Sequence, residues 1–176
     1  MRTALFLCCA LMLVSCGKDK SHEQTQSAAT DEAQIESMVR TMYAGLARAY
    51  NEGGVNTDSL FEANYEKDVR YVTAWGSTEP IDSTKARLKN ALSHIKDFNH
   101  RIEGMHVKSY GGAAFAFFIL RQQYTVDGSM LDEYLPTTFV LERRGSGWKI
   151  VHVQRSTDYE TMQQYAAMQQ RREAKK

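Results

Sequence analysis

The most informative part of this chain is the segment Trp148-Lys149-Ile150-Val151-His152-Val153-Gln154-Arg155-Ser156. The side chains of a β-strand alternate between two faces, and here both faces carry apolar groups. One parity comprises Trp148, Ile150, His152 and Gln154, and the other comprises Val151, Val153 and Arg155. A strand that is apolar on both faces is covered on both sides. Because Arg155 places a cation beside these valines, the segment also suggests an anion-binding site.

An earlier strand-like segment, residues 113–126, repeats this pattern. One parity contains Phe115, Phe117, Ile119 and Arg121, and the other contains Ala116, Phe118 and Leu120. In a small antiparallel protein the second cover of such strands is often another subunit. We therefore predict a homodimer whose interface contains Trp148, Ile150, His152, Phe118 and Leu120. The alternative is that a final helix covers the outer face within one chain.

The N-terminus has the features of a lipoprotein signal peptide. Met1-Arg2 gives a positive start, residues 4–14 form an apolar run, and a cysteine follows at Cys16. The run is shorter than the ~20 residues that span a bilayer. Leu13-Val14-Ser15-Cys16 resembles the lipobox of bacterial lipoproteins, in which cleavage leaves an acylated cysteine at the new N-terminus. An ordinary secretory signal with an unrelated cysteine is the alternative.

This resemblance implies lipidation of Cys16 and anchoring in a bacterial cell envelope. Residues 1–15 are then the signal peptide, and residues 16–29 are the lipidated cysteine with a polar, flexible tether. Gly17, and not an aspartate, follows the cysteine. Among bacterial lipoproteins an aspartate here favours the inner membrane, so Gly17 favours the outer membrane, facing the periplasm. Surface exposure stays open.

The remaining composition argues against several partner classes. All three cysteines lie at or before Cys16, so the domain has none for disulfides. Arg2 is one of 22 basic residues, and without the signal peptide 21 basic side chains face 21 acidic ones. A balanced chain has no field that would attract nucleic acid. His94, His100 and His106 have neither the helical nor the strand spacing of metal ligands, and no metal or cofactor is predicted.

Hydrophobic periodicity divides the domain into helices followed by strands. We predict a helix at 31–50, a helical turn at 58–63, a strand at 69–75 and a second helix from about 80 to 95. A period of two then predicts strands at 98–110, 113–126, 129–144 and 148–156. Bulges are expected at Gly104, where the pattern slips, and at Pro136, which has no N–H to donate. Thr157 and Glu160 form a capping box for a final helix.

These elements predict an α+β fold in which a curved antiparallel sheet wraps around N-terminal helices. The domain occupies residues 30–156, and residues 157–176 form an extra C-terminal helix and tail.

The order of elements resembles the NTF2-like (SnoaL-like) superfamily, whose cone-shaped domains have a pocket between a bent sheet and the helices. The C-terminal part is most similar to the association domain of calcium/calmodulin-dependent protein kinase II and its bacterial relatives. The residues that carry this similarity are Ala116, Ile119, Arg121, Gln123, Tyr124, Arg143, Arg144, residues 147–153, Arg155 and Ser156.

In that family, arginines on pocket-facing strands bind small carboxylates. By position, the resemblance implies that Arg121 and Arg155 form such a clamp, and that Phe139 replaces a third arginine. Tyr71 and Trp75 are expected to line the pocket rim. An unpaired buried charge costs several kcal/mol, so the alternative for the arginines is an internal salt bridge. Its possible partners are Glu133, Glu142 and Asp132.

Three classes of function stay open. The first is a dimeric, non-enzymatic binding or scaffold domain that holds a small carboxylate. The second is an enzyme similar to the superfamily's isomerases and cyclases, such as ketosteroid isomerase, and the third is an interaction module with a vestigial pocket. We favour binding, because no Asp or Glu is assigned to a pocket-facing strand and His152 has the surroundings of an interface histidine. No catalytic residue is named, and a pocket carboxylate near Tyr71 or Tyr124 would favour the enzyme.

Overall fold

The computed structural model describes residues 20–174, with the side chains of residues 27–174. The predicted signal peptide and Cys16 lie outside these residues. The elements are α1 (Lys20–Asn51), α2 (Thr57–Asn64), β1 (Tyr65–Val72), β2 (Thr78–Pro80), α3 (Ile81–Ala91), β3 (Ile95–Tyr110), β4 (Ala113–Val126), β5 (Ser129–Arg144), β6 (Gly147–Arg155) and α4 (Tyr159–Glu173). This order confirms the predicted α+β class, although β2 was not predicted.

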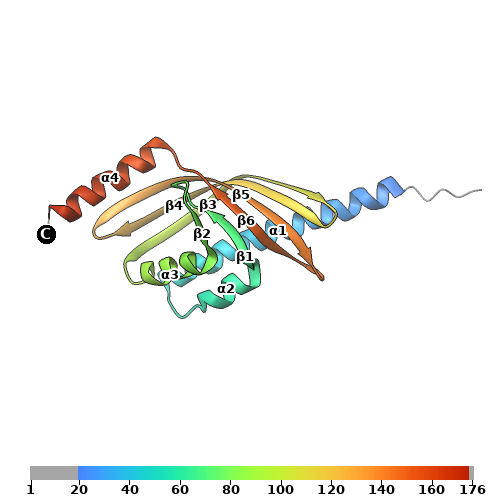
Figure 1. Ribbon diagram of the computed structural model, residues 1–176, viewed down its shortest axis with the longest axis horizontal. Helices are drawn as coiled ribbons and strands as arrows, with labels where there is room; N and C mark the ends of the chain where they lie inside the picture. The colour runs from blue at the N-terminus through green and yellow to red at the C-terminus, as the bar shows by residue number, and fades with distance from the viewer. Residues whose placement is uncertain (1–19, 175–176) are drawn as a thin grey trace, which may run out of the picture.

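A single six-stranded sheet has the strand order β2-β1-β6-β5-β4-β3. Strands β3 to β6 form an antiparallel meander, as predicted. Strand β1 instead pairs with β6 in parallel, so the sheet is not antiparallel throughout. No hairpin joins these two strands, and therefore no tight turn imposes opposite directions on them. The sheet is curved, and Figure 1 shows α1, α2 and α3 on one side of it.

Helix α1 packs along the inner face of the sheet. Its residues Ile35, Val39, Met42 and Tyr43 are buried at the predicted spacing of three and four. The helix begins at Lys20, so the segment predicted as a flexible tether is helical from that residue onward. The prediction placed the start near residue 31 because the apolar stripe begins only at Ile35, and earlier turns carry no such signal.

Strand β3 bends at Gly104. Its register against β4 shifts between Glu103 and His106, and Gly104 has a φ of 57°. Glycine adopts this left-handed conformation without the steric cost that a Cβ would bring. The bulge predicted from the slipped hydrophobic pattern is therefore confirmed, and it contributes to the curvature of the sheet.

A further bulge, which was not predicted, lies in β6. Val140 pairs with His152 and the next residue, Leu141, pairs with Ile150, so Val151 has no partner of its own. One extra residue reverses the alternation of all side chains beyond it. As a result Ile150 and Val153, both fully buried, point to the same inner face. The predicted separation of Trp148 and Ile150 from Val153 and Arg155 is therefore wrong, because all four point to the inner face, whereas His152 points to the outer face as predicted.

This face assignment also changes the predicted dimer surface. Four of its five residues, Trp148, Ile150, Phe118 and Leu120, are at most 4% exposed and belong to the core within one chain. For example, the ring of Phe118 packs edge-on against Tyr43 of α1, with centroids 5.8 Å apart. His152 alone of the five lies on the outer face, opposite Val140. The prediction failed because α1 already covers the face that was assigned to a second subunit.

Pro136 does not lie at a bulge. It pairs with Ile119 of β4 without a register shift. On its other side, its carbonyl accepts a 3.0 Å hydrogen bond from the N–H of Ser156, just beyond the end of β6. The N atom and carbonyl of one strand residue point the same way. The ring nitrogen of Pro136, which has no hydrogen to donate, therefore faces Ser156, where β6 has just left the sheet.

Helix α4 covers the edge of β5 that β6 leaves open. The N–H of Tyr134 donates to Thr161 Oγ1 at 3.1 Å, and the N–H of Asp132 donates to Gln164 Oε1 at 2.9 Å. The N-cap is Asp158, whose side chain accepts from the N–H of Thr161 at 2.8 Å, and not Thr157 as predicted. The helix therefore seals an edge, and the outer face of the sheet stays open in the described chain.

Candidate ligand-binding cavity

A cavity of about 740 Å³ lies between the inner face of the sheet and the helices. Its volume is that of a small-molecule site. Most of its walls are apolar, and many are aromatic. The aromatic lining consists of Tyr43, Tyr50, Phe61, Tyr65, Tyr71, Trp75, Tyr124 and Tyr165. A ligand that fills this space must bury apolar or aromatic surface.

Arg155, the last residue of β6, brings a positive charge into the cavity. Its Nη2 donates a 2.7 Å hydrogen bond to the hydroxyl of Tyr43, and its guanidinium lies 5.4 Å from the ring centre of Tyr71. Burial raises the pKa of Tyr43 to about 12, so this partner is neutral. The Nε atom is buried without a hydrogen-bond partner. Among the described residues, no carboxylate lies within ion-pair distance of Arg155.

Glu133 on β5 brings a carboxylate into the same cavity. Its side chain is 7% exposed, and its Oε1 accepts a hydrogen bond from the hydroxyl of Tyr165 on α4. The hydroxyls of Tyr165 and Tyr124 are 2.6 Å apart. Burial raises the pKa of the Glu133 carboxyl, and hydrogen bonds from Tyr165 and Tyr124 offset this only in part. Carboxyls with raised pKa values inside a cavity are typical of acid–base sites.

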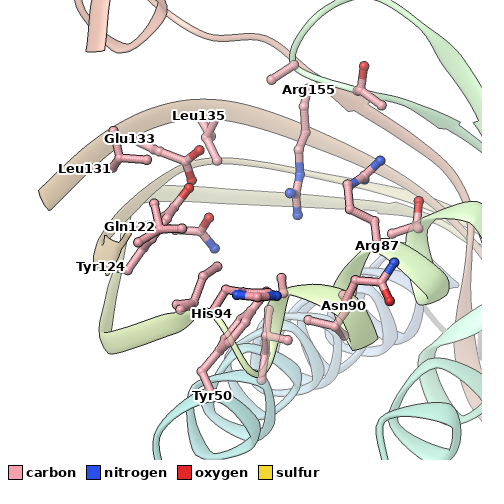
Figure 2. A pocket seen from close by; sticks show the side chains of 18 of the residues that line it. Tyr50, Arg87, Asn90, His94, Gln122, Tyr124, Leu131, Glu133, Leu135 and Arg155 are labelled. Carbon is pink, nitrogen blue, oxygen red and sulfur yellow. The ribbon is translucent and has the colours of Figure 1, made fainter. Parts of the chain in front are cut away.

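Figure 2 shows how these groups are distributed. Arg155 reaches into the middle of the cavity, with Glu133, Gln122 and Tyr124 on one side and Arg87 and Asn90 on the other. Gln122, only 8% exposed, adds a neutral amide to the polar lining.

Two other arginines line the cavity, and both are neutralised by acidic partners. Arg87 of α3 forms an ion pair of 2.6 Å with Glu79, and Arg172 of α4 pairs with Asp127 in the β4–β5 turn. Among the described lining residues, Arg155 is therefore the arginine that keeps its charge available for a ligand.

Arg121 does not reach the cavity. Its neighbours along β4, Leu120 and Gln122, point inward, so Arg121 points to the outer face, where its guanidinium lies 4.6 Å from the ring centre of Tyr134. The predicted clamp of Arg121 and Arg155 therefore does not form, because the two side chains lie on opposite faces. The alternative of an internal salt bridge does not hold for Arg121 either, since no acidic side chain of the described residues lies within ion-pair distance of it, and Asp158 interacts with it only from farther away.

Of the other three predicted pocket residues, two line the cavity and one lies in the core. Tyr71 is buried and lines the cavity, and Trp75 lies at its rim, 53% exposed, with its ring edge-on to Tyr165 at 4.9 Å. Phe139 is fully buried in the core against Phe118, at a ring distance of 5.1 Å, and does not line the cavity.

Glu133 and Tyr165 were not predicted as site residues. The signal for Glu133 was present, because it shares its parity with the buried Leu131, Leu135 and Phe139 of β5. A charged residue in an apolar row of a strand indicates a special site. No comparable signal marked Tyr165, since its position depends on how α4 docks.

Metal binding has no support in the described residues. They contain no cluster of three or more His, Cys, Asp or Glu side chains that could hold an ion. Of the three histidines weighed above, His94 lines the cavity, His100 stacks on Phe98, and His106 packs against Phe115. None of the described helices is long and apolar enough to cross a membrane.

Several solved structures share this fold. A protein of Exiguobacterium sibiricum, described as a candidate calcium/calmodulin-dependent kinase II association domain, has a TM-score of 0.58 and 16% identity, over 72% of this chain and 92% of that chain. An NTF2-like protein of Cytophaga hutchinsonii has a TM-score of 0.58 and 10% identity, over 70% and 95%. A candidate dehydratase of the NTF2-like family from Streptomyces avermitilis has a TM-score of 0.61 and 14% identity, over 74% and 98%. At these identities the similarity establishes the fold alone.

A comparison with curated protein sequences finds no match. The profile of the SnoaL-like domain, however, matches residues 39–168. This range contains Glu133, Arg155 and Tyr165 as well as the C-terminal part of α1 and all of the sheet. The chain therefore belongs to the SnoaL-like domain family.

Proposed function

We propose that this domain binds a small organic carboxylate in its cavity, with Arg155 as the anchor. The observation that carries the proposal is the guanidinium itself. It reaches into the cavity, makes one hydrogen bond to a neutral hydroxyl and leaves its buried Nε unpaired. A guanidinium has five N–H donors whose planar arrangement matches a carboxylate. The aromatic walls favour an acid with an apolar or aromatic body.

Calorimetric titration with phenylacetate and benzoate tests this proposal. Arg155→Met should weaken binding about tenfold or more, the effect of losing hydrogen bonds to a charged group. Arg155→Lys should recover only part of the affinity, because an ammonium cannot bind a carboxylate in the same bidentate way. Arg121→Met is the matched control, since this arginine lies on the opposite face. Binding that survives Arg155→Met in a folded protein would contradict the proposal.

A second candidate function is proton transfer on the bound acid, and Glu133 is the observation that favours it. A buried carboxyl with a raised pKa lines the same cavity as the anion anchor, and Tyr124 lies beside it. Such a group can take a proton from an acidic C–H of the ligand and return it elsewhere. The similarity to a candidate dehydratase is compatible with this chemistry, because elimination of water also requires proton transfer.

Phenylpyruvate is a suitable probe for this activity, since its carboxylate can meet Arg155 and its benzylic C–H is acidic. In heavy water, proton NMR should show faster loss of the benzylic signal with the protein than with buffer. Glu133→Gln should abolish this exchange and preserve phenylpyruvate binding. Exchange at the buffer rate with wild-type protein would remove the enzyme candidate and leave the binding proposal intact.

The oligomeric form is proposed to be a dimer through the outer face of the sheet, not through the residues first predicted. Phe117 and Val140 are 40% and 37% exposed there, and Phe115 and Ile119 are half-buried beside them. Similar folds include association and hub domains of kinases. Phe117→Asp should give a monomer in light scattering, whereas Met130→Asp, at an exposed residue at the start of β5, should not. A wild-type monomer would end this proposal.

The proposed location is the bacterial cell envelope, with lipid on Cys16 and the outer membrane as the favoured site. The sequence of residues 13–17 supports this, as described above. Cys16→Ser should release the protein from the membrane fraction and abolish labelling by radioactive palmitate. Labelling that persists in this variant would contradict the assignment of Cys16.

A further inference from the structure

Helix α4 supplies a wall of the cavity that the meander lacks. Strand β6 ends at Arg155, so the first half of β5 has no strand partner on that side. Helix α4 occupies this place and lends Tyr165, Met168 and Arg172 to the cavity lining. Glu133 belongs to the same unpaired half of β5, between Asp132 and Tyr134, whose N–H groups bond to α4.

The contact between Tyr165 and Glu133 differs from the other contacts of α4. Thr161 and Gln164 accept hydrogen bonds from the backbone of β5 and have no role inside the cavity. Tyr165 instead donates a hydrogen bond to a carboxylate oxygen of Glu133, which lines the ligand space. Burial raises the pKa of the Tyr165 hydroxyl far above its usual range. The hydroxyl therefore stays protonated and acts as a hydrogen-bond donor.

The surroundings of Glu133 contain few charged groups. The titratable groups that interact with it are Tyr165 of α4, Tyr124 of β4, Arg155 of β6, Tyr50 of α1 and Tyr71 of β1. Of these, Arg155 is charged and belongs to the proposed ligand anchor. The hydroxyls of Tyr165 and Tyr124 are therefore the neutral groups that can hold the carboxylate in one orientation.

We propose that helix α4 is part of the ligand site and that Tyr165 is a positioning residue, which orients Glu133 toward the bound ligand. The proposal deepens the function proposed above and rests on it for the identity of the site. The chain connectivity supports it, because only Ser156 and Thr157 separate Arg155 from Asp158, the N-cap of α4. The anion anchor and the helix that orients the carboxylate are thus parts of one short segment.

The test is a carbon-13 NMR titration of the Glu133 side-chain carboxyl in the full-length, ligand-free protein. Tyr165→Phe removes a donor that lowers the carboxyl pKa, so the titration midpoint should rise by about one pH unit. Tyr159→Phe makes the same chemical change on the same helix at an exposed side chain and should leave the midpoint unchanged. Cooperative urea unfolding of both variants shows that they are folded.

An unchanged midpoint in Tyr165→Phe, or equal shifts in Tyr165→Phe and Tyr159→Phe, would overturn the positioning role. Because the titration uses no ligand, this result is independent of phenylacetate binding. If phenylacetate binds and the midpoints do not move, the inference fails and the binding function stands. If the midpoints move and neither phenylacetate nor benzoate binds, the binding function fails, and Tyr165 orients Glu133 without the proposed ligand role.

Discussion

Arg155 and Tyr43 are joined by a 2.7 Å hydrogen bond between Nη2 and the phenolic oxygen, across 112 positions of sequence. The bond connects the end of β6 to the C-terminal half of α1 inside the cavity. This hydrogen bond directs the guanidinium toward the ligand space. Among the described side chains, Tyr43 is the hydrogen-bond partner of the Arg155 guanidinium. A neutral acceptor holds the cation without cancelling its charge.

The role of this bond can be measured with Tyr43→Phe. The variant should lose about 1–2 kcal/mol of unfolding free energy in urea, the usual effect of removing a partner from a charged donor. Tyr71→Phe is the control, because its ring also contacts Arg155 but its hydroxyl forms no hydrogen bond of its own among the described residues. Similar losses in both variants would show that the Arg155–Tyr43 bond contributes nothing specific.

The stability of the protein should depend on pH through Glu133. The folded-state pKa of this carboxyl is raised above 4.5, so the folded protein binds its proton more tightly than the unfolded chain does. This contribution to stability is complete below pH 4.5 and is lost as the pH rises through the raised folded-state pKa. Glu133→Gln should therefore be more stable than wild type at pH 7, with the difference disappearing near pH 4. Urea unfolding at both pH values measures it, and Glu160→Gln on the surface of α4 is the control.

The bulge in β3 should depend on the backbone of Gly104. Its φ of 57° disfavours a residue with a Cβ, although no atom would contact that Cβ within 4 Å. Gly104→Ala should cost about 1 kcal/mol of unfolding free energy from conformation alone. Gly112→Ala also has open space, but Gly112 lacks the positive φ, so its stability should change little. If the two variants have the same stability, the bulge does not depend on glycine.

Docking of α4 should depend on its N-cap. Asp158→Ala removes the side chain that accepts from Thr161 N–H and should cost about 1 kcal/mol. Asp158→Ser retains a capping oxygen and should lose little. The hydrogen bonds with Thr161 hold the pKa of Asp158 below 3.8, so the cap is stabilising above this pH and is lost as acid protonates it. Circular dichroism during urea unfolding at pH 7 and pH 3 compares the variants, and equal stability of Asp158→Ala and Asp158→Ser would rule out the cap.

The sequence predicted where the strands begin and end better than it predicted which of their side chains point inward. Strands β4 and β5 occupy the predicted ranges, because alternation and the Asp127-Gly128 turn are local signals. The family resemblance was correct for the same reason, since it rested on the order of the elements and on residues of β4, β5 and β6. Tyr71 and Trp75 were placed near the cavity by their positions alone, and the structure puts both in its lining.

The predicted site was correct for Arg155, which faces the cavity, and wrong for Arg121, which does not. Val151 gives β6 an extra position, and therefore Arg155 faces inward with Ile150 and away from Arg121. A bulge without glycine leaves no mark on the hydrophobic pattern, so the pairing of strands alone reveals it. Glu133 was overlooked although it shares its parity with Phe139, which was expected at the pocket.

By itself the sequence determined the elements other than β2, the α+β class and the presence of a cation in a largely apolar strand, because these depend on local spacing. The tertiary structure decided which groups share the cavity. Register placed Arg155 there and removed Arg121, the packing of α1 turned the predicted interface into core, and the docking of α4 brought Tyr165 to Glu133. Each of these results depends on contacts between segments far apart in the chain, and local periodicity carries no information about them.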